Sequence, residues 1–439
     1  MSRCWFAVGV LLACCASTRA GEDPKAWVEK HVGEVVEVYH WFHQHPELSF
    51  EEKETGERLA SELKAVGAEV TTEFGGHGVV AILSNGPGPR IMLRTDLDAL
   101  PVTEKTGLVY ASKVTAKTED GQTSGVMHAC GHDIHISNQI GVARYLAANK
   151  DRWSGTVMFI GQPAEEKGGG AQAMLAAGLF TKFPKPSAAL ALHVDSQMAT
   201  GKVGYRVGQT HANVDSVDII VRGRGGHGAY PSLTIDPIVE AARLVMDLQT
   251  IVSRELKAID PAVITVGAIH GGTKHNIIGD SCHLQLTVRS YTPEVRKHLL
   301  EAIRRKALAT AASSGAPEPS IEFSDGTPAV FNDAKLIERL LPTFRRVVGE
   351  SNVVEVDPTM GGEDFSEYGL AGVPIFMFRL GSVDAQRLAG FKRLNQTAPT
   401  LHSPDYYPDA EAALSTGIAV MSSAVLEMLP ASSESSGAK

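Results

Sequence analysis

Residues 136–193 decide the fold class, because segments of two types alternate along them. In order, they read ISNQIGVARYLAA (136–148), VMFI (157–160), GAQAMLAAGL (170–179) and ALALH (189–193). The first and third segments have the apolar spacing of helices, and the second and fourth are apolar runs of strand length. Strands that alternate with helices predict an α/β domain with a largely parallel sheet. In such sheets, binding and catalytic residues gather at the carboxyl ends of the strands.

The same pattern continues on both sides of this stretch. Toward the N-terminus, we expect helices at 24–44 and 54–66 and strands at 79–83 and 91–94. Toward the C-terminus, we expect helices at 335–348 and 411–429 and a buried strand at 373–378. These outer segments extend the α/β domain predicted above.

Residues 210–325 follow a different plan. Strands are expected at 214–222, 262–269, 283–289 and 320–323, and helices at 236–251 and 293–312. The order β-α-β-β-α-β is that of a ferredoxin-like split motif. The simplest organisation is one α/β catalytic domain, formed by residues 21–209 and 326–430, that is interrupted by a small inserted α+β domain.

The composition excludes several classes of protein. The chain has 439 residues, of which 43% are apolar and 21% charged, and its formal net charge is −9. A disordered chain would combine low hydrophobicity with high net charge, so that class is excluded. No sustained short period indicates a collagen-like or coiled-coil rod. The acidic balance argues against nucleic acid as a partner, since phosphate binding needs a basic surface.

The first twenty residues resemble a targeting segment. Arg3 precedes the apolar run 5–13, and small residues lead to Ala20, which is the arrangement of a secretory signal peptide. The run is shorter than the roughly 20 apolar residues that span a bilayer, and no later segment is long enough. We therefore expect an exported protein, periplasmic or extracellular, without a membrane span. Lipid attachment at Cys14 is the alternative. The polar tail 431–439 is expected to be disordered.

The strongest chemical signal is the segment HACGHDIH at 128–135. It places four potential metal ligands, three histidines and a cysteine, within eight residues, and thiolate and imidazole suit zinc and its neighbours. Gly131 lets the backbone turn, so that Cys130 and His132 can point at one centre. The alternative is a surface loop with scattered histidines. After the leader only Cys130 and Cys282 remain, so one disulfide is possible but a disulfide framework is not.

Two adjacent carboxylates and two separate histidines complete a possible ligand set. Glu165 and Glu166 follow the run 157–160, and one could bind metal while the other holds a water as general base. Acidic residues at a helix start often only complement the helix dipole, which is the alternative. His193 ends an apolar run and His402 lies in a proline-marked loop. Taken singly, each of these histidines is more often structural than a ligand.

Seven motifs occur in an order that resembles the M20 metallopeptidase family. They are His43-x-x-Pro46-Glu47-Leu48-Ser49, Asp96-x-Asp98-Ala99-Leu100-Pro101, the HACGHD segment at 128–133, Gln162-Pro163-Ala164-Glu165-Glu166, Gly225-Gly226-His227, Gly271-Gly272-Thr273-x-x-Asn276 and Gly362-Glu363-Asp364-Phe365-Ser366. The resemblance covers nearly all of the mature chain. It is greatest to the branch with hippurate hydrolase, N-acyl-amino-acid amidohydrolases and the plant auxin-conjugate (IAA-amino acid) hydrolases. It implies that the inserted domain is a lid and dimerisation domain and that the protein is a homodimer.

The resemblance also implies a binuclear metal centre. Zinc is the default metal, with manganese, cobalt or nickel as alternatives. The implied ligands are Cys130, which would bridge the two ions where many relatives have Asp, together with His132, Glu166, His193 and His402.

Further roles follow from the same resemblance. Glu165 would be the general base, and Asp98 would orient a ligand or the base from behind. His227 and Asn276, from the inserted domain, would contact the substrate at the tetrahedral stage. Arg289 would bind the substrate carboxylate in a bidentate way. Cys282 matches no functional position and is expected in the core.

The function implied is metal-dependent hydrolysis of the amide bond of an N-acyl amino acid, with hippurate-type substrates included, by a metal-activated water and a Glu base. A carboxypeptidase or dipeptidase of the same family is the alternative. A thiol hydrolase with Cys130 as nucleophile belongs to a different class, and it leaves His193, His402 and the two glutamates without a task. A non-catalytic binding protein has no support, because every expected ligand position is filled. The expected partner is a small N-acyl amino acid or short peptide.

Overall fold

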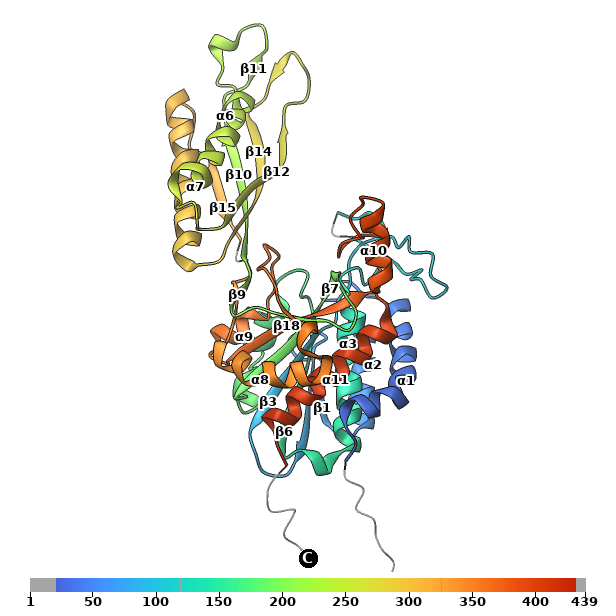
Figure 1. Ribbon diagram of the computed structural model, residues 1–439. Helices are drawn as coiled ribbons and strands as arrows, with labels where there is room; N and C mark the ends of the chain where they lie inside the picture. Colours follow the sequence, from blue (N-terminus) through green and yellow to red (C-terminus); the bar gives the residue numbers. More distant parts are fainter. Residues whose placement is uncertain (1–20, 119, 325, 432–439) are drawn as a thin grey trace, which may run out of the picture.

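A computed structural model describes residues 21–118, 120–324 and 326–431 (Figure 1). The predicted signal peptide at 1–20, with Cys14, lies outside the described residues, as does the predicted tail except for its first residue. None of the helices in the described part of the chain is both long and apolar enough to cross a membrane.

The larger part of the molecule is built on an eight-stranded sheet with the order β1-β2-β6-β3-β7-β18-β8-β17. Its four central strands run parallel: β6 (Gly155–Gln162), β3 (Arg90–Asp96), β7 (Ala188–Ala199) and β18 (Ile375–Val383). Two antiparallel strands flank them, β2 (Val79–Asn85) beside β6 and β8 (Val203–Tyr205) beside β18. At the edges, β1 (Glu69–Thr71) pairs antiparallel with β2, and β17 (Val353–Glu355) pairs parallel with β8. The largely parallel sheet predicted from the sequence is confirmed.

Helices cover both faces of this sheet, because its strand residues alternate between two apolar cores. Phe376 and Phe378 of β18 join the core on one face, and Ile375 and Met377 join the core on the other. The first face is covered by α1 (Pro24–Gln44), α2 (Lys53–Ala65), α3 (His132–Ala148), α8 (Ala334–Val348) and α11 (Ala410–Met428). The second is covered by α4 (Gly170–Ala176), α5 (Leu179–Lys182) and α9 (Ser366–Leu370).

Two sequence predictions in this part need correction. The single helix expected at 170–179 is two short helices, because Gly178 adopts a left-handed φ of 92° between α4 and α5. His193 does not end its strand, since β7 continues to Ala199. The remaining short elements are β4 (Thr115–Lys117), β5 (Thr123–Gly125), α10 (Ala385–Arg393), η1 (Lys150–Arg152) and η4 (Glu350–Asn352).

The ferredoxin-like order of elements expected in the inserted part is present. They are β10 (Asn213–Arg222), α6 (Pro237–Thr250), β12 (Ala262–Gly271), β14 (Ser281–Ser290), α7 (Pro293–Ser314) and β15 (Ser320–Phe323). The strands form an antiparallel sheet with the order β12-β14-β10-β15. Both helices share a core with it that contains Cys282. Cys282 and Cys130 are both buried free thiols, so they form no disulfide.

The inserted part is joined to the larger part through a short two-stranded ribbon. Strand β9 (Gly208–His211), which enters the inserted part, pairs with strand β16 (Val330–Asn332), which leaves it. The opposite end carries η2 (Pro231–Leu233) and the pair β11 (Gly226–His227) and β13 (Ile277–Ile278), and Figure 1 shows β11 at the tip farthest from the main sheet. A π-helical turn, η3 (Ile251–Glu255), ends α6.

One face of α6 exposes apolar side chains. Ile238, Val239 and Met246 are 40%, 56% and 70% exposed. Apolar surface of this kind is typical of sites that another protein surface covers. The homodimer implied by the resemblance stays a prediction.

His43, in the first of the motifs, ties α1 to the start of α3. Its Nδ1 lies 2.8 Å from Asp133 Oδ2 and its Nε2 lies 3.3 Å from Glu104 Oε1. Both ring nitrogens face carboxylates, so both donate, and the ring is an imidazolium. Burial alone would lower the pKa of His43, but the hydrogen bonds with Asp133 and Glu104 outweigh it and raise the pKa to about 9.

The hydrogen bonds of His43 with Asp133 and Glu104 predict that part of the free energy of unfolding depends on pH. A pKa raised from 6.5 to about 9 is worth about 3 kcal/mol, fully present below pH 6.5 and lost as the pH rises toward 9. The difference in unfolding free energy between the wild type and His43→Gln should therefore shrink by about 3 kcal/mol between these limits, as measured by denaturant titration. His40→Gln is the control, because its carboxylate neighbour Glu37 is exposed. A difference independent of pH would contradict the assignment.

Candidate metal centre

The loop at 128–132 turns two side chains toward one centre. Gly131 has a φ of 80°, and a Cβ at this position would lie 2.6 Å from Val194 Cγ2. Only glycine combines this conformation with this close approach. His132 begins α3 directly afterwards, and Cys130 precedes the turn, so both side chains come from the two sides of one tight bend.

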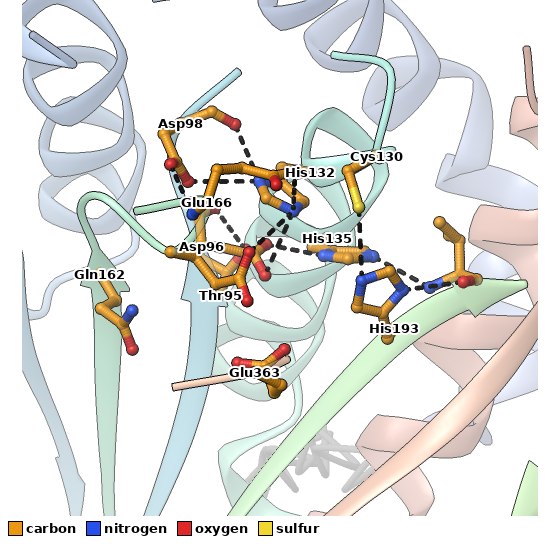
Figure 2. A network of polar contacts seen from close by, with 12 residues as sticks. Thr95, Asp96, Asp98, Cys130, His132, His135, Gln162, Glu166, His193 and Glu363 are labelled. Atoms are coloured by element: carbon orange, nitrogen blue, oxygen red, sulfur yellow. Dashed lines mark hydrogen bonds and ion pairs between the residues drawn. The ribbon is translucent and has the colours of Figure 1, made fainter. Parts of the chain in front are cut away.

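The structure brings all five predicted ligands together in two groups that share Cys130. One group is Cys130, His132 and His193, and the other is Cys130, Glu166 and His402; within each group the ligand atoms lie within 4.8 Å of one another. Cys130 Sγ is 3.5 Å from His193 Nε2 (Figure 2). His402 Nε2 is 3.4 Å from Glu166 Oε1. Two sets of donors with one common thiol form a geometry that suits two neighbouring cations.

Two potential metal-ligand atoms in this cluster have no hydrogen-bond partner among the described residues. They are His132 Nε2 and Glu166 Oε1, which are both buried and lie 3.8 Å apart. Unpartnered buried polar atoms cost free energy unless something satisfies them. A divalent cation would satisfy both, and thiolate, imidazole and carboxylate form a ligand set that suits zinc. The residues present therefore fit a metal.

The histidine rings are oriented by bonds to backbone carbonyls. His132 Nδ1 lies 2.8 Å from the Asp98 carbonyl oxygen, and His193 Nδ1 lies 2.8 Å from the Val194 carbonyl oxygen. Since a carbonyl only accepts, each Nδ1 carries the proton and each Nε2 keeps its lone pair. Asp98 also accepts from Ser49 Oγ at 2.6 Å and from the Glu166 backbone N–H at 2.9 Å. Asp98 therefore holds two neighbouring ligands in place from behind.

The backbone is strained at the residue before Glu165 and at His402 itself. Ala164, directly before Glu165, has a φ of 49°, and His402 has a φ of 68°. Such left-handed conformations cost about 1–3 kcal/mol for residues other than glycine and occur often at functional sites. The His402 N–H donates to the Ala129 carbonyl at 2.9 Å, which joins the 402 loop to the Cys130 loop.

Glu165 lies beside the cluster in an acidic environment. Its carboxylate is grouped with those of Glu363 and Asp364 within 4.8 Å, and its side chain is 9% exposed. Burial, and then the carboxylates of Glu363 and Glu166, raise the pKa of Glu165 well above its usual value. A raised pKa suits a group that takes up a proton.

Two histidines of the 128–135 segment lie outside both groups of predicted ligands. His135 Nδ1 is 2.7 Å from Asp96 Oδ1, and its Nε2 accepts from the Val194 N–H at 3.0 Å, so both ring nitrogens are already used. His128 is buried, and burial lowers its pKa to about 4.

A cavity of about 670 Å³ opens onto the cluster. Cys130, Glu165 and His402 line it on the catalytic side, and Arg289 lines it from β14 of the inserted part. Arg289 donates to the Met360 carbonyl at 2.6 Å.

His227 and Asn276 do not line this cavity. They lie together at the exposed tip of the inserted part, where the Gly228 N–H donates to the Asn276 carbonyl at 2.9 Å. Contact between them and a substrate in this cavity would need a domain movement or a second copy of the chain. Their predicted role stays a prediction.

Several site residues received no role from the sequence. Arg94 is buried and donates to Asp96 at 2.8 Å, to Glu363 at 2.9 Å and to Asp364 at 3.0 Å. Two sequence features could have indicated this cluster: Arg94 at the end of the apolar run 91–94, and the acidic pair Glu363-Asp364 in the last of the seven motifs. His211 and Arg379, which also line the cavity, carried no signal because their partners are distant in sequence.

An α/β sheet that presents paired ligand groups beside a buried glutamate and a cavity is typical of metal-dependent hydrolases. A sequence profile of the peptidase family M20/M25/M40 matches residues 92–427. The chain belongs to this family, which confirms the resemblance seen in the motifs. It is a hydrolytic enzyme that acts on amides.

Individual relatives are similar over most of their length. An N-acetylcysteine deacetylase of Bacillus subtilis (strain 168) is 35% identical over 74% of this chain and 82% of the relative. The IAA-amino acid hydrolase ILR1-like 2 of Arabidopsis thaliana is 32% identical over 80% of this chain and 77% of the relative. Thermostable carboxypeptidase 1 of Saccharolobus solfataricus is 36% identical over 81% of this chain and 89% of the relative.

A solved structure matches the whole architecture. The Bacillus subtilis YXEP protein, described as a dinuclear metal-binding peptidase of the M20 family, superimposes with a TM-score of 0.72 at 30% identity. The match covers 91% of this chain and all of that one.

The turn at Gly131 yields a prediction on metal binding. Gly131→Ala adds a Cβ that meets Val194 in a left-handed conformation, so Cys130 and His132 should move apart. We expect the metal content of the purified protein, measured by elemental analysis, to fall by at least half. Gly121→Ala is a matched control, because Gly121 has the same φ of 80° but nothing within 4 Å of the added atom. Equal metal loss in both variants would show that backbone strain alone is responsible.

Proposed function

We propose that this protein hydrolyses the amide bond of N-acyl amino acids with the help of two divalent cations. The observation that carries the proposal is the pair of ligand groups that share Cys130, beside a buried Glu165 at one end of the cavity. The deacetylase and the IAA-amino acid hydrolase among the relatives support this substrate class.

The ligand residues would be Cys130, His132, Glu166, His193 and His402. Zinc is the metal that best suits this mixture of thiolate, imidazole and carboxylate, and manganese, cobalt or nickel are the alternatives. Cations held by these residues would polarise the substrate carbonyl oxygen and make a water more acidic.

The chain's own groups would move the protons. Glu165 accepts a proton from the attacking water as the oxygen adds to the amide carbonyl carbon, and it then donates that proton to the leaving nitrogen. The acidic environment of Glu165 favours the first step, since Glu363 and Glu166 raise its affinity for a proton. Asp98 keeps the His132 ring and the Glu166 backbone in position throughout.

A carboxypeptidase is the second candidate for the activity. The carboxypeptidase among the relatives favours it, and a peptide also offers an amide with a carboxylate on its amine side. Arg289, at the cavity wall, is a candidate for that carboxylate in both cases.

Removal of the metal separates this proposal from a thiol hydrolase. A chelator should abolish hydrolysis of a panel of N-acetyl amino acids, and added zinc or manganese should restore it, because the water is activated only beside the cations. An iodoacetamide-sensitive activity that survives the chelator would instead favour Cys130 as nucleophile. The initial rate of amino acid release is the measurement.

Glu165→Gln tests the base. The amide cannot accept the proton, so we expect kcat to fall by a factor of about 10² or more, while the metal content stays at the wild-type level. Glu367→Gln is the control, because Glu367 is a surface partner of Gln172. Near-normal turnover in Glu165→Gln would show that another group is the base.

A further inference from the structure

Arg379 lies in the wall of the cavity next to a predicted metal ligand. It belongs to β18, in register with His193 on the neighbouring strand β7. Both residues line the cavity, as does His211 from β9. The Arg379 guanidinium donates to His211 Nε2 at 2.6 Å, and the His193 and His211 rings are 6.5 Å apart between centroids.

Arg379 is half-buried and opens onto the cavity. No ion pair among the described residues involves it, whereas the buried Arg94 contacts three carboxylates. Burial lowers the pKa of Arg379, although Asp195 and Glu363 oppose the shift from a greater distance. A guanidinium that is partly shielded from water is well suited to bind a carboxylate through charge-assisted hydrogen bonds. Among the described residues, the Arg379 side chain hydrogen-bonds to His211 alone, so its remaining N–H groups are available to an anion in the cavity.

His211 holds the Arg379 guanidinium in place. A guanidinium has no lone pair to offer, so His211 Nε2 must accept from Arg379 and Nδ1 must carry the proton. That Nδ1 is buried and has no hydrogen-bond partner among the described residues. His211 itself is only 3% exposed. Because this Nδ1 is closed to solvent, His211 does not itself donate to a ligand; it positions Arg379, whose guanidinium lines the cavity.

The rest of the cavity wall suits a polar ligand. Apart from glycines, the apolar residues among the described part of its lining are Val214 and Leu401. The polar ones on the inserted side and in the loops are Ser216, Ser324, Thr327 and Thr359. Pockets for aromatic or fatty groups are lined predominantly by hydrophobic and aromatic side chains, and this wall has almost none.

We propose that Arg379, positioned by His211, binds a carboxylate of the substrate at a site separate from Arg289. The site lies beside His193, so the carboxylate would be within a few bonds of the scissile amide. It can come from the amino acid or from a carboxylated acyl group such as succinyl. This inference rests on the proposed function, since it names the charged group that the same cavity selects.

Matched substrates test the proposal. On the amino acid side, N-acetyl-L-methionine is compared with its primary amide; on the acyl side, N-succinyl-L-methionine is compared with N-succinamoyl-L-methionine. For one of these pairs, we expect the wild type to prefer the carboxylate by about 10- to 100-fold in kcat/KM. Arg379→Met should remove at least tenfold of that preference, chiefly through KM, and Arg379→Lys should keep part of it. The pair that responds identifies the source of the carboxylate.

Ligand binding to metal-free protein tests the carboxylate site independently of the proposed hydrolytic activity. Calorimetry on chelator-treated protein with the same four compounds should show tighter binding of the carboxylate member, and Arg379→Met should abolish the difference. Arg90→Met is the control, because Arg90 lies at the opposite end of β3 and donates to the Pro184 carbonyl.

Three results decide the matter. Equal losses for the charged and neutral members in Arg379→Met, or an unchanged preference, would overturn the carboxylate site. Loss of the preference in Arg379→Met, with normal thermal stability, supports it. If none of the compounds is hydrolysed but the binding preference exists and depends on Arg379, the carboxylate site stands and the proposed function fails.

Discussion

The buried ion cluster around Arg94 is the interaction on which the geometry of the site depends. Its guanidinium joins the end of β3, through Asp96, to the end of β6, through Gln162. The same group binds Glu363 and Asp364 in the loop before α9. Without this cation, buried carboxylates would face one another at close range, at a cost of several kcal/mol each. Arg94 therefore permits an acidic surrounding for Glu165 inside a folded protein.

A second constraint fixes the ligands before any cation arrives. Backbone carbonyls hold the Nδ1 atoms of His132 and His193, so their lone pairs already face the shared thiol of Cys130. The ligands come from a turn, a strand and two loops, and the strained φ values of Ala164 and His402 show that the surrounding structure holds two of these segments firmly. A site prepared in this way loses little conformational entropy when it binds metal.

The cavity draws its walls from both parts of the chain. The catalytic part supplies the candidate ligands, Glu165 and Arg379, whereas Arg289 and Val214 come from the base of the inserted part. The ribbon of β9 and β16 connects the two parts and carries His211. The segment that attaches the inserted part thus also supplies the residue that positions Arg379, and the place of Arg289 relative to the cluster depends on this ribbon.

The sequence by itself determined the fold class and the order of elements in the inserted βαββαβ unit, because these rest on local periodicity. Its short motifs, through their resemblance to a known family, implied the five candidate ligands. It missed the break at Gly178, where one glycine in a left-handed conformation divides a helical pattern. Only the tertiary structure decided that His135 hydrogen-bonds to Asp96, that His227 and Asn276 lie far from the cavity, and that Arg379 has no carboxylate partner among the described residues. The physical reason is that charge pairing and burial depend on neighbours brought together from distant strands, and no local pattern encodes those neighbours.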